Sequence, residues 1–285
     1  MVRTEAFTKK VLERLKIINE AYQNEGSMTI RRCFYILVGK NKISNSKVSY
    51  KLLSRNLTKA RELGYVGWDV IADRHRTILK RSTCTSFDEI FDIACQSFRK
   101  NSMDLQDNYV EVWIEKDAVS SIIYDYTHDL DVPLFVGKGF PSTTYIKKAS
   151  DRIKESGKPC IILYVSDFDP EGEYFPKKVQ QKLVQYGCSD FRIEKIALTK
   201  QQREKYNLPS NKDFTINKYH KDKNYVKDFI DKNGIIQIEL DALPNSVLVD
   251  FLRESVEKLI DTNLPLKSDE ESSVEVQRWK WDNLK

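Results

Sequence analysis

The sequence predicts an α/β protein in which an N-terminal helical unit precedes a mostly parallel, Rossmann-like sheet covered by helices. Two observations carry this prediction. Before about residue 76, apolar residues recur three and four positions apart, as in amphipathic helices. From residue 109 onward, short apolar runs alternate with helical patterns, which is typical of parallel strands buried on both faces. The chain of 285 residues is long enough for two such units.

Three helices are expected in the N-terminal unit, over residues 9–22, 30–38 and 47–63. In the third, an apolar face is predicted from the spacing of six residues: Val48, Leu52, Leu53, Leu57, Ala60 and Leu63. Four cations fall four positions apart on the same helix, and they should form one ridge opposite the leucines: Lys47, Lys51, Arg55 and Lys59. Such a ridge suits a helix that lies along phosphates or in a major groove, although a solvated helix face is also commonly rich in Lys.

The segment 65–71 is predicted to form a short β-ribbon after these helices. Three helices followed by a β-wing describe a winged-helix (CAP-like) DNA-binding domain, which we place at residues 1–76. Residues 77–108 are expected to be a linker with one helix near 87–98. The tail, residues 263–285, looks solvated, although Trp279 and Trp281 are candidates for docking on the body or on a partner.

The charge is divided unevenly along the chain. The first 100 residues contain 20 Lys and Arg against 10 Asp and Glu, whereas the remaining 185 contain 27 against 32. A basic N-terminal part predicts contact with a polyanion, and the carboxylates of the remainder serve another purpose. Apolar runs stay far short of the roughly 20 residues that cross a bilayer, and the start carries no apolar leader. We therefore expect a cytoplasmic protein without a membrane partner.

The second unit, residues 109–262, is expected to alternate strands and helices. Strands are predicted at 109–115, 132–136, 159–166, 191–198 and 235–240, and helices at 118–126, 142–155, 171–186 and 245–260. Ligand sites of parallel sheets lie at the carboxyl ends of the strands. That rule directs attention to Glu115, which ends the first strand, and to Asp167 and Asp169, which directly follow the third.

Any metal in this protein is predicted to sit on carboxylates. The five cysteines are widely spaced without a C-x-x-C pair, and the three histidines do not cluster. Glu115, Asp167 and Asp169 would repel one another unless a hard cation neutralised them, so Mg²⁺ is the expected cofactor, with Mn²⁺ as a candidate substitute. Glu171 is a candidate for an additional ligand. The alternative is that Asp169 simply caps the helix that begins at Pro170.

A strand-end Glu followed by D-x-D after a later strand resembles the Toprim domain of type II topoisomerases, primases and certain nucleases. Upstream, Arg31-Arg32-Cys33-Phe34-Tyr35 resembles the R-x-x-Y/F-Y motif of the topoisomerase VI A subunit and of the related meiotic double-strand-break transesterase. The segment 238–244 is similar to a late segment of those A subunits. The resemblance spans about residues 27–262 and is greatest to the compact Mini-A-type proteins of phages and mobile elements.

The resemblance implies a DNA-cleaving transesterase with winged-helix and Toprim domains. Tyr35 would attack a backbone phosphate of double-stranded DNA and form a 5′-phosphotyrosyl link, with Mg²⁺ held by the Toprim carboxylates. Arg31 would favour the phenolate and the developing phosphoryl charge, and Arg32 is a weaker DNA-binding candidate. In that family Tyr and metal act from opposite protomers, so a homodimer is expected, near the nucleoid. Phe34 departs from the usual Tyr pair.

Three alternatives accompany this expectation. The Toprim carboxylates could activate water, as in overcoming-lysogenization-defect-type or Wadjet-type nucleases, with Tyr35 purely structural. The protein could also bind DNA without catalysis. Tyr35 itself could be a core residue, since Ile30, Phe34 and Leu37 make its helix apolar. No G-x-x-x-x-G-K-[ST] nucleotide loop occurs, so an ATPase B-type subunit would be a separate candidate partner.

Overall fold

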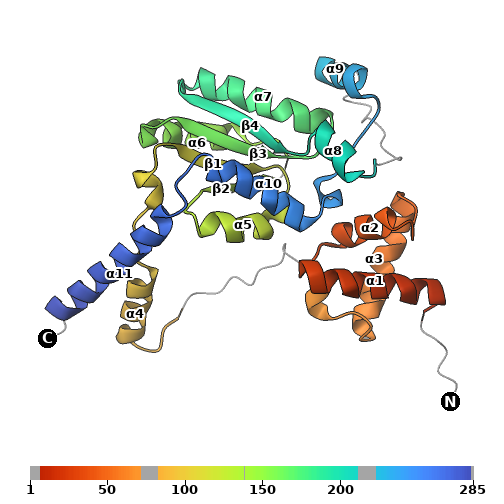
Figure 1. The fold of residues 1–285 in the computed structure, drawn as a ribbon, viewed down its shortest axis with the longest axis horizontal. Coiled ribbons are helices and arrows are strands. Elements are labelled where there is room, and N and C mark those ends of the chain that lie inside the picture. The colour runs from red at the N-terminus through yellow and green to blue at the C-terminus, as the bar shows by residue number, and fades with distance from the viewer. Residues whose placement is uncertain (1–6, 72–82, 138, 211–222, 284–285) are drawn as a thin grey trace.

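A computed structural model describes residues 7–71, 83–137, 139–210 and 223–283. It is an α/β structure built on a four-stranded parallel sheet, with the N-terminal helices packed at one end and a helical arm at the other (Figure 1). The strands are β1 (Tyr109–Ile114), β2 (Leu134–Val136), β3 (Cys160–Val165) and β4 (Phe191–Ala197). This confirms the expected α/β class and the parallel sheet.

The sheet has the strand order β2-β1-β3-β4. From β1 the chain passes through α5 (Ser120–His128) to β2 on one side, then through α6 (Thr143–Ser156) to β3 on the other side. From β3 it continues through α7 (Pro170–Gln185) to β4. The direction of winding therefore reverses between β1 and β3, and the carboxyl ends of these two strands border the crevice where open parallel sheets bind ligands.

Alternate strand residues enter two separate apolar cores because successive side chains point to opposite faces of a sheet. Trp113, Ile162 and Tyr164 pack under α6 and α7. Val112, Ile161 and Leu163 belong to the larger core, which α5 and α10 (Asn245–Glu257) cover and which extends into the N-terminal helices. Figure 1 shows α6 and α7 on one face of the sheet and α5 and α10 on the other.

The N-terminal helices form as predicted, with small changes at their ends: α1 (Lys9–Glu25), α2 (Ile30–Gly39) and α3 (Lys47–Glu62). Thr29 and Ser46 cap α2 and α3 through their side chains. The predicted apolar face of α3 is wrong at its edges. Leu53, Leu57 and Ala60 are buried, but three residues of that face are exposed to solvent: Val48, Leu52 and Leu63.

The predicted β-wing at residues 65–71 is not a ribbon. The segment turns at Gly64 and forms a 3₁₀ helix, η1 (Trp68–Val70), and its one strand-like contact is a single parallel bridge between Met28 and Ile71. The segment closes over α1 and α2 because the Met28 amide donates to the Val70 carbonyl at 2.9 Å. Residues 72–82, which contain the predicted domain boundary at 76, lie outside the described residues.

The predicted strand at 235–240 is also wrong. This segment makes one antiparallel bridge, between Ile238 and Phe168, and then forms the 3₁₀ helix η4 (Leu240–Ala242). It cannot extend the sheet, because it crosses the carboxyl end of β3 instead of running beside a strand. Helix α9 (Asn224–Asn233) precedes it, and α8 (Lys200–Tyr206) follows β4.

The linker and the tail form a helical arm. The predicted linker helix is present as α4 (Phe87–Ser97), followed by η2 (Ser102–Leu105). The tail forms α11 (Leu264–Asn283), and most of its side chains are exposed, as expected of a solvated tail. It docks through Ser268 and Ser272, which are buried and hydrogen-bond to the Lys100 backbone at 2.9 and 3.0 Å. Trp279 packs on Phe91 of α4, with ring centroids 5.3 Å apart.

No helix among the described residues combines the length and the apolar character needed to cross a bilayer.

Candidate functional site

The carboxyl ends of β1 and β3 bring the predicted acidic residues together. Glu115 follows β1, and Asp167 follows β3, its neighbour in the sheet. Glu115, Asp167 and Asp169 are all buried, with exposed fractions of 8%, 2% and 5%. Since burying even one carboxylate is costly, three of them at one sheet edge indicate a site that a positive charge completes.

The loop between β3 and α7 is shaped by two local requirements. Asp169 caps α7, since its Oδ1 accepts a hydrogen bond from the Gly172 amide at 2.8 Å. The helix begins very close to the strand, and a Cβ on Gly172 would lie 2.1 Å from the Asp167 carbonyl oxygen. The capping alternative is therefore correct for Asp169, and it coexists with the burial of this residue beside Asp167.

Every oxygen of the Asp167 and Asp169 carboxylates has a partner. Asp167 Oδ1 accepts a hydrogen bond from the Leu240 amide at 2.9 Å, and its Oδ2 pairs with Lys116 Nζ. Asp169 Oδ2 accepts from Gln237 at 3.1 Å. The segment 235–240, which was predicted as a fifth strand, therefore holds the acidic loop in place through Gln237 and Leu240.

Glu115 is the least satisfied of the three carboxylates. Its Oε2 atom is buried and accepts no hydrogen bond from a described residue. Burial, followed by the negative charges of Asp167 and Asp169, raises the pKa of Glu115 to about 8. Burial and the charge of Asp167 raise the pKa of Asp169 as well. Without a cation, the cluster thus carries less negative charge than three free carboxylates would. A bound cation would stabilise the ionised forms of these carboxylates.

The residues fit the expected divalent cation in donor chemistry. Three carboxylates supply hard oxygen donors of the kind that Mg²⁺ takes, and Glu115 offers an oxygen without another partner. In the described ranges, no group of three acidic, His or Cys side chains is arranged as a ready-made metal site. Lys116 supplies the positive charge beside Asp167. Glu171, the candidate for an additional ligand, lines the same cavity as Glu115 and Asp169.

The raised pKa of Glu115 predicts how pH affects stability in the absence of metal. Its folded value of about 8 exceeds the ordinary 4.5, so the folded state holds a proton that the unfolded chain releases. This stabilisation is complete below the ordinary value and is lost as pH rises through about 8. Relative to the wild type, Glu115→Gln should therefore gain about 1 kcal/mol or more between pH 6 and pH 9, in urea unfolding with chelator present.

Glu254→Gln, which removes an exposed carboxyl on α10, controls for the loss of one negative charge. An equal effect of the two substitutions at both pH values would contradict the burial argument.

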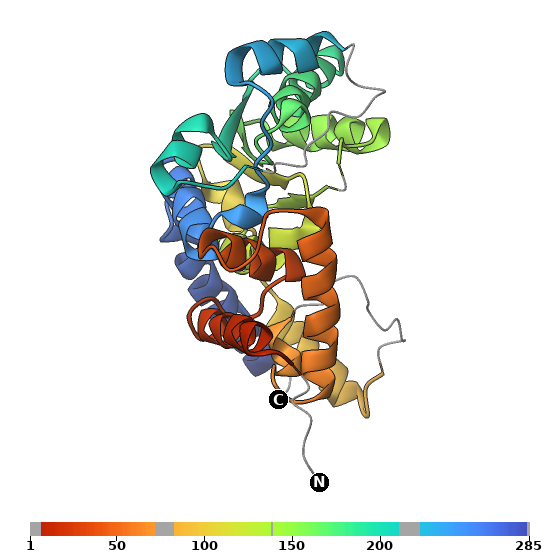
Figure 2. The ribbon, with the colours of Figure 1, turned by 90° about the vertical axis from the view of Figure 1, so that its right-hand side faces the viewer.

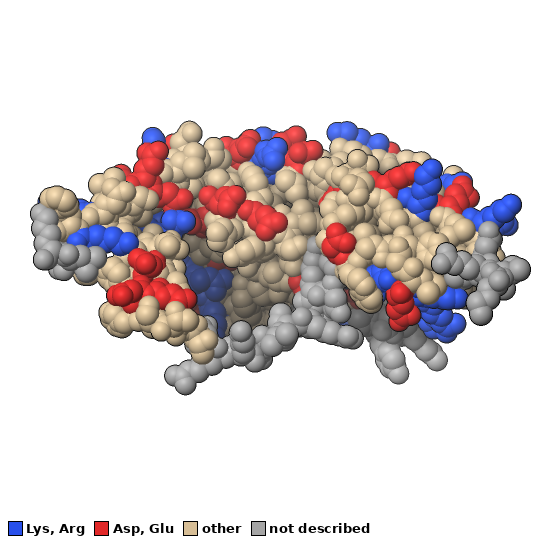
Figure 3. All heavy atoms as spheres, turned by 90° about the horizontal axis from the view of Figure 1, so that it is seen from below, with Lys and Arg blue, Asp and Glu red and all other residues tan. Residues whose placement is uncertain are grey.

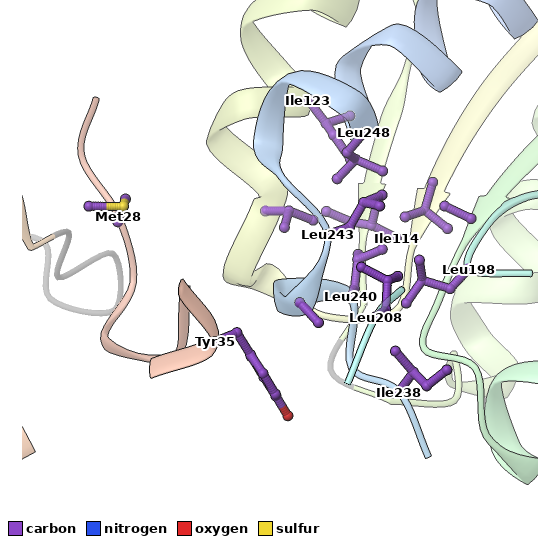
Figure 4. Close-up of a cluster of buried hydrophobic side chains, with 14 of the residues drawn as sticks. Met28, Tyr35, Ile114, Ile123, Leu198, Leu208, Ile238, Leu240, Leu243 and Leu248 are labelled. Carbon is purple, nitrogen blue, oxygen red and sulfur yellow. The ribbon is translucent and has the colours of Figure 1, made fainter. Parts of the chain in front are cut away.

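Tyr35 lies on α2 against η4, next to the acidic edge of its own chain. Figure 4 shows its ring reaching from α2 toward the segment with Ile238 and Leu240, with the hydroxyl at the tip clear of the labelled aliphatic side chains. The residue is only 4% exposed. Burial, then the charge of Glu239, raises the pKa of Tyr35, and Arg31 opposes this rise. The phenol is therefore strongly protonated in this arrangement.

Arg31 contacts an acidic partner rather than Tyr35 directly. Its Nη1 donates to Glu239 Oε2, and its guanidinium lies 5.2 Å from the centre of the Tyr50 ring. Thr29 at the start of α2 donates to Asp241 at 2.8 Å. These contacts fasten α2 to η4, which lie side by side in Figure 2. Arg31 is thus near Tyr35 but is also bound to the acidic segment.

Arg32 does not fit its predicted role in binding DNA. It is 7% exposed, and its guanidinium donates to both carboxylate oxygens of Glu25, at 2.8 and 2.7 Å. It also reaches the Asp241 and Ala242 carbonyls at 3.4 and 3.3 Å. Side chains at adjacent helix positions point about 100° apart. Arg32 therefore points into the interface between α1, α2 and η4, whereas Arg31 does not.

The Arg32 pair yields a stability prediction. Glu25→Ala should lower the free energy of unfolding by about 3 kcal/mol, because it leaves a buried guanidinium without its counter-charge. Glu20→Ala on the same helix removes an exposed partner of Lys16, 3.9 Å away, and should cost less than about 0.5 kcal/mol. Chemical unfolding of both variants provides the comparison, and equal costs would show that the Arg32 pair is not structurally important.

The basic ridge of α3 is exposed as predicted. All four of its side chains are exposed: Lys47, Lys51, Arg55 and Lys59. In Figure 3, basic groups are interspersed with acidic ones, and several lie over the N-terminal helices at the right. The ridge is therefore accessible to a polyanion.

Sequence reasoning missed three charged residues of the site. Lys116 follows Glu115 directly and pairs with Asp167, whereas Glu239 and Asp241 come from a segment noted only for its family resemblance. Burial raises the pKa of both Glu239 and Asp241. The signal in the sequence was the alternation of acids with apolar residues in Ile238-Glu239-Leu240-Asp241.

Comparison with models of known protein families finds no match, and comparison with curated protein sequences finds none either.

Proposed function

We propose that this protein cleaves double-stranded DNA by transesterification, with Tyr35 as the nucleophile and Mg²⁺ held by Glu115, Asp167 and Asp169. The observation that carries the proposal is the meeting of a phenol, an arginine and a buried carboxylate cluster at the switch point of a parallel sheet. Toprim and winged-helix domains, as the resemblance implies, belong to the same proposal. Mg²⁺, when bound, would neutralise the carboxylates and polarise the phosphate.

The proposed step exchanges one phosphodiester bond for another. Tyr35 Oη forms a bond to phosphorus and loses its proton to a base, and the bond from phosphorus to the 3′-oxygen breaks. The 3′-oxygen takes up a proton and leaves as a hydroxyl. The free energy of the broken phosphodiester bond is conserved in the 5′-phosphotyrosyl bond, so the DNA can be rejoined. Arg31 would stabilise the charge on the phosphoryl oxygens once its bond to Glu239 is exchanged for one to phosphate.

Hydrolysis is the second candidate, and the burial of Tyr35 favours it. A phenol that is 4% exposed, with a raised pKa, is a poor nucleophile unless α2 moves away from η4. In hydrolysis the same carboxylates would act on water, and Tyr35 would serve packing, edge to face with Phe34 at 5.3 Å. The two candidates share the site and differ only in the group that attacks phosphorus.

The deciding experiment is incubation of the protein with supercoiled plasmid and Mg²⁺, followed by detergent and then protease. Transesterification predicts linear DNA whose 5′ ends carry protein that protease removes. Linear DNA with plain 5′-phosphate ends would instead assign hydrolysis. Intact plasmid under all conditions would leave only DNA binding and overturn the proposed activity.

DNA binding by the α3 ridge predicts a change in salt dependence. Lys51→Ala with Arg55→Ala should weaken duplex binding and flatten the slope of log affinity against log salt by about 2 units, because each phosphate contact contributes nearly one. Lys10→Ala with Lys16→Ala removes the same charge from exposed positions on α1. In titrations at several salt concentrations, the control variant should show a steeper slope than the Lys51/Arg55 variant. Equal slopes for the two variants would contradict the assignment.

A further inference from the structure

We propose that the cavity beside the acidic edge is a binding site for a single unstacked nucleotide, a step that rests on the proposed function only in taking DNA as the substrate. The cavity measures about 920 Å³, which is in the usual range for ligand pockets of roughly 300 to 1,000 Å³. Its walls come from the β1 end, the start of α7 and the start of α9. One part of the cavity is therefore bordered by the carboxylates, and the rest by residues of α7 and α9 to which the transesterification step assigns no role.

One wall of this nucleotide pocket is aromatic. Tyr174 of α7 and Tyr225 of α9 are stacked, with ring centroids 4.2 Å apart and planes at 10°. Phe140 and Phe175 add a second pair, edge to face at 5.1 Å. Aromatic rings with partly exposed faces are the platforms on which proteins stack unpaired bases, whatever the base. Phe140 and Phe175 also pack against the apolar core under α6 and α7, whereas Tyr174 and Tyr225 are half-buried and belong to neither core.

Two lysines on the same wall supply phosphate-binding charge. Lys178 Nζ lies 5.0 Å from the Phe140 ring centre and 5.9 Å from that of Tyr174, and Lys223 lies 5.8 Å from that of Tyr225. At the opposite end, the cavity is lined by the carboxylate-bearing residues Glu115 and Asp169. The cavity thus offers stacking and cations at one end and carboxylates at the other, which matches a base on the rings with its own phosphate beside the lysines.

The test measures binding by the full chain in chelator, so that cleavage does not take place and failure of the proposed activity cannot mask the result. The probes are a labelled single strand of about 12 nucleotides, within known site sizes, and labelled deoxyadenosine monophosphate. Tyr225→Leu should weaken binding roughly 5- to 150-fold, whereas Tyr225→Phe keeps the ring and the affinity. Tyr124→Leu, at an exposed tyrosine on α5, is the remote control.

A second pair of variants tests the lysine wall without altering the rings. Lys178→Gln should weaken binding and reduce the salt slope by about 0.7, the value for one phosphate contact on a single strand. Lys177→Gln, one position away, exposed and outside the cavity walls, should leave the slope unchanged. Neither lysine is buried, so both variants should fold.

The two probes separate the sources of the ligand. Binding of the strand, but not of the mononucleotide, with loss in the variants, assigns the pocket to DNA. Binding of both with the same losses assigns it to the nucleotide unit itself. If Tyr225→Leu and Lys178→Gln bind both probes like the wild type, the nucleotide pocket is wrong, whatever the plasmid experiment shows.

Discussion

Replacing Tyr35 by Phe is expected to abolish protein-linked DNA and to lower the rate of plasmid cleavage by at least about a thousandfold, as when a nucleophile is removed. The substitution is structurally mild. It keeps the ring that packs on Phe34, and no described residue hydrogen-bonds to the Tyr35 hydroxyl. Gel analysis after detergent, with and without protease, measures both quantities. Cleavage that persists in Tyr35→Phe with ordinary 5′-phosphate ends would establish hydrolysis.

Mixing two inactive variants identifies which chain supplies each half of the site. In this chain Tyr35 lies near its own Asp167, whose charge contributes to the raised pKa of Tyr35, whereas the resemblance implies the carboxylates of a partner. If the dimer shares its sites, a mixture of Tyr35→Phe and Asp167→Asn proteins regains one complete site and nicks the plasmid. If each chain works alone, the mixture stays inactive, because every site then lacks one component.

Asp167→Asn combined with Asp169→Asn is expected to remove Mg²⁺ binding and cleavage together. Calorimetric titration of the wild type should give a binding heat, and Mg²⁺ at about 100 times its Kd should stabilise the fold by about 2.7 kcal/mol. The double variant should show neither effect. The substitutions keep local structure, because Asn caps helices as well as Asp and its side-chain oxygen still accepts from the Gly172 and Leu240 amides.

Asp129→Asn with Asp250→Asn removes the same formal charge at exposed positions, so it should bind Mg²⁺ as the wild type does. Equal heats for the wild type and the Asp167/Asp169 variant would exclude these carboxylates as the metal site. The protein would then be left with the non-catalytic DNA-binding hypothesis.

The periodicity of apolar residues predicted most helices and the four strands of the sheet to within a few residues. It succeeded because the spacing of apolar residues within one helix or strand is a local property of the sequence. It failed at 65–71 and 235–240, where apolar residues are buried by crossing other segments rather than by pairing along a strand. It also missed the docked helix of the tail, since Ser268 and Ser272 are buried through small size and hydrogen bonds that hydropathy does not register.

The sequence by itself determined the parallel sheet and the positions of Glu115, Asp167 and Asp169, because strand ends are local features and parallel strands share one edge. Only the tertiary structure decided which cations pair with which acidic residues. Lys116 reaches Asp167, Arg31 reaches Glu239 some 208 positions away, and Arg32 turns inward to Glu25. These pairings depend on how β1 lies beside β3 and on how α2 packs against α1 and η4. The order of residues along the chain does not specify those contacts.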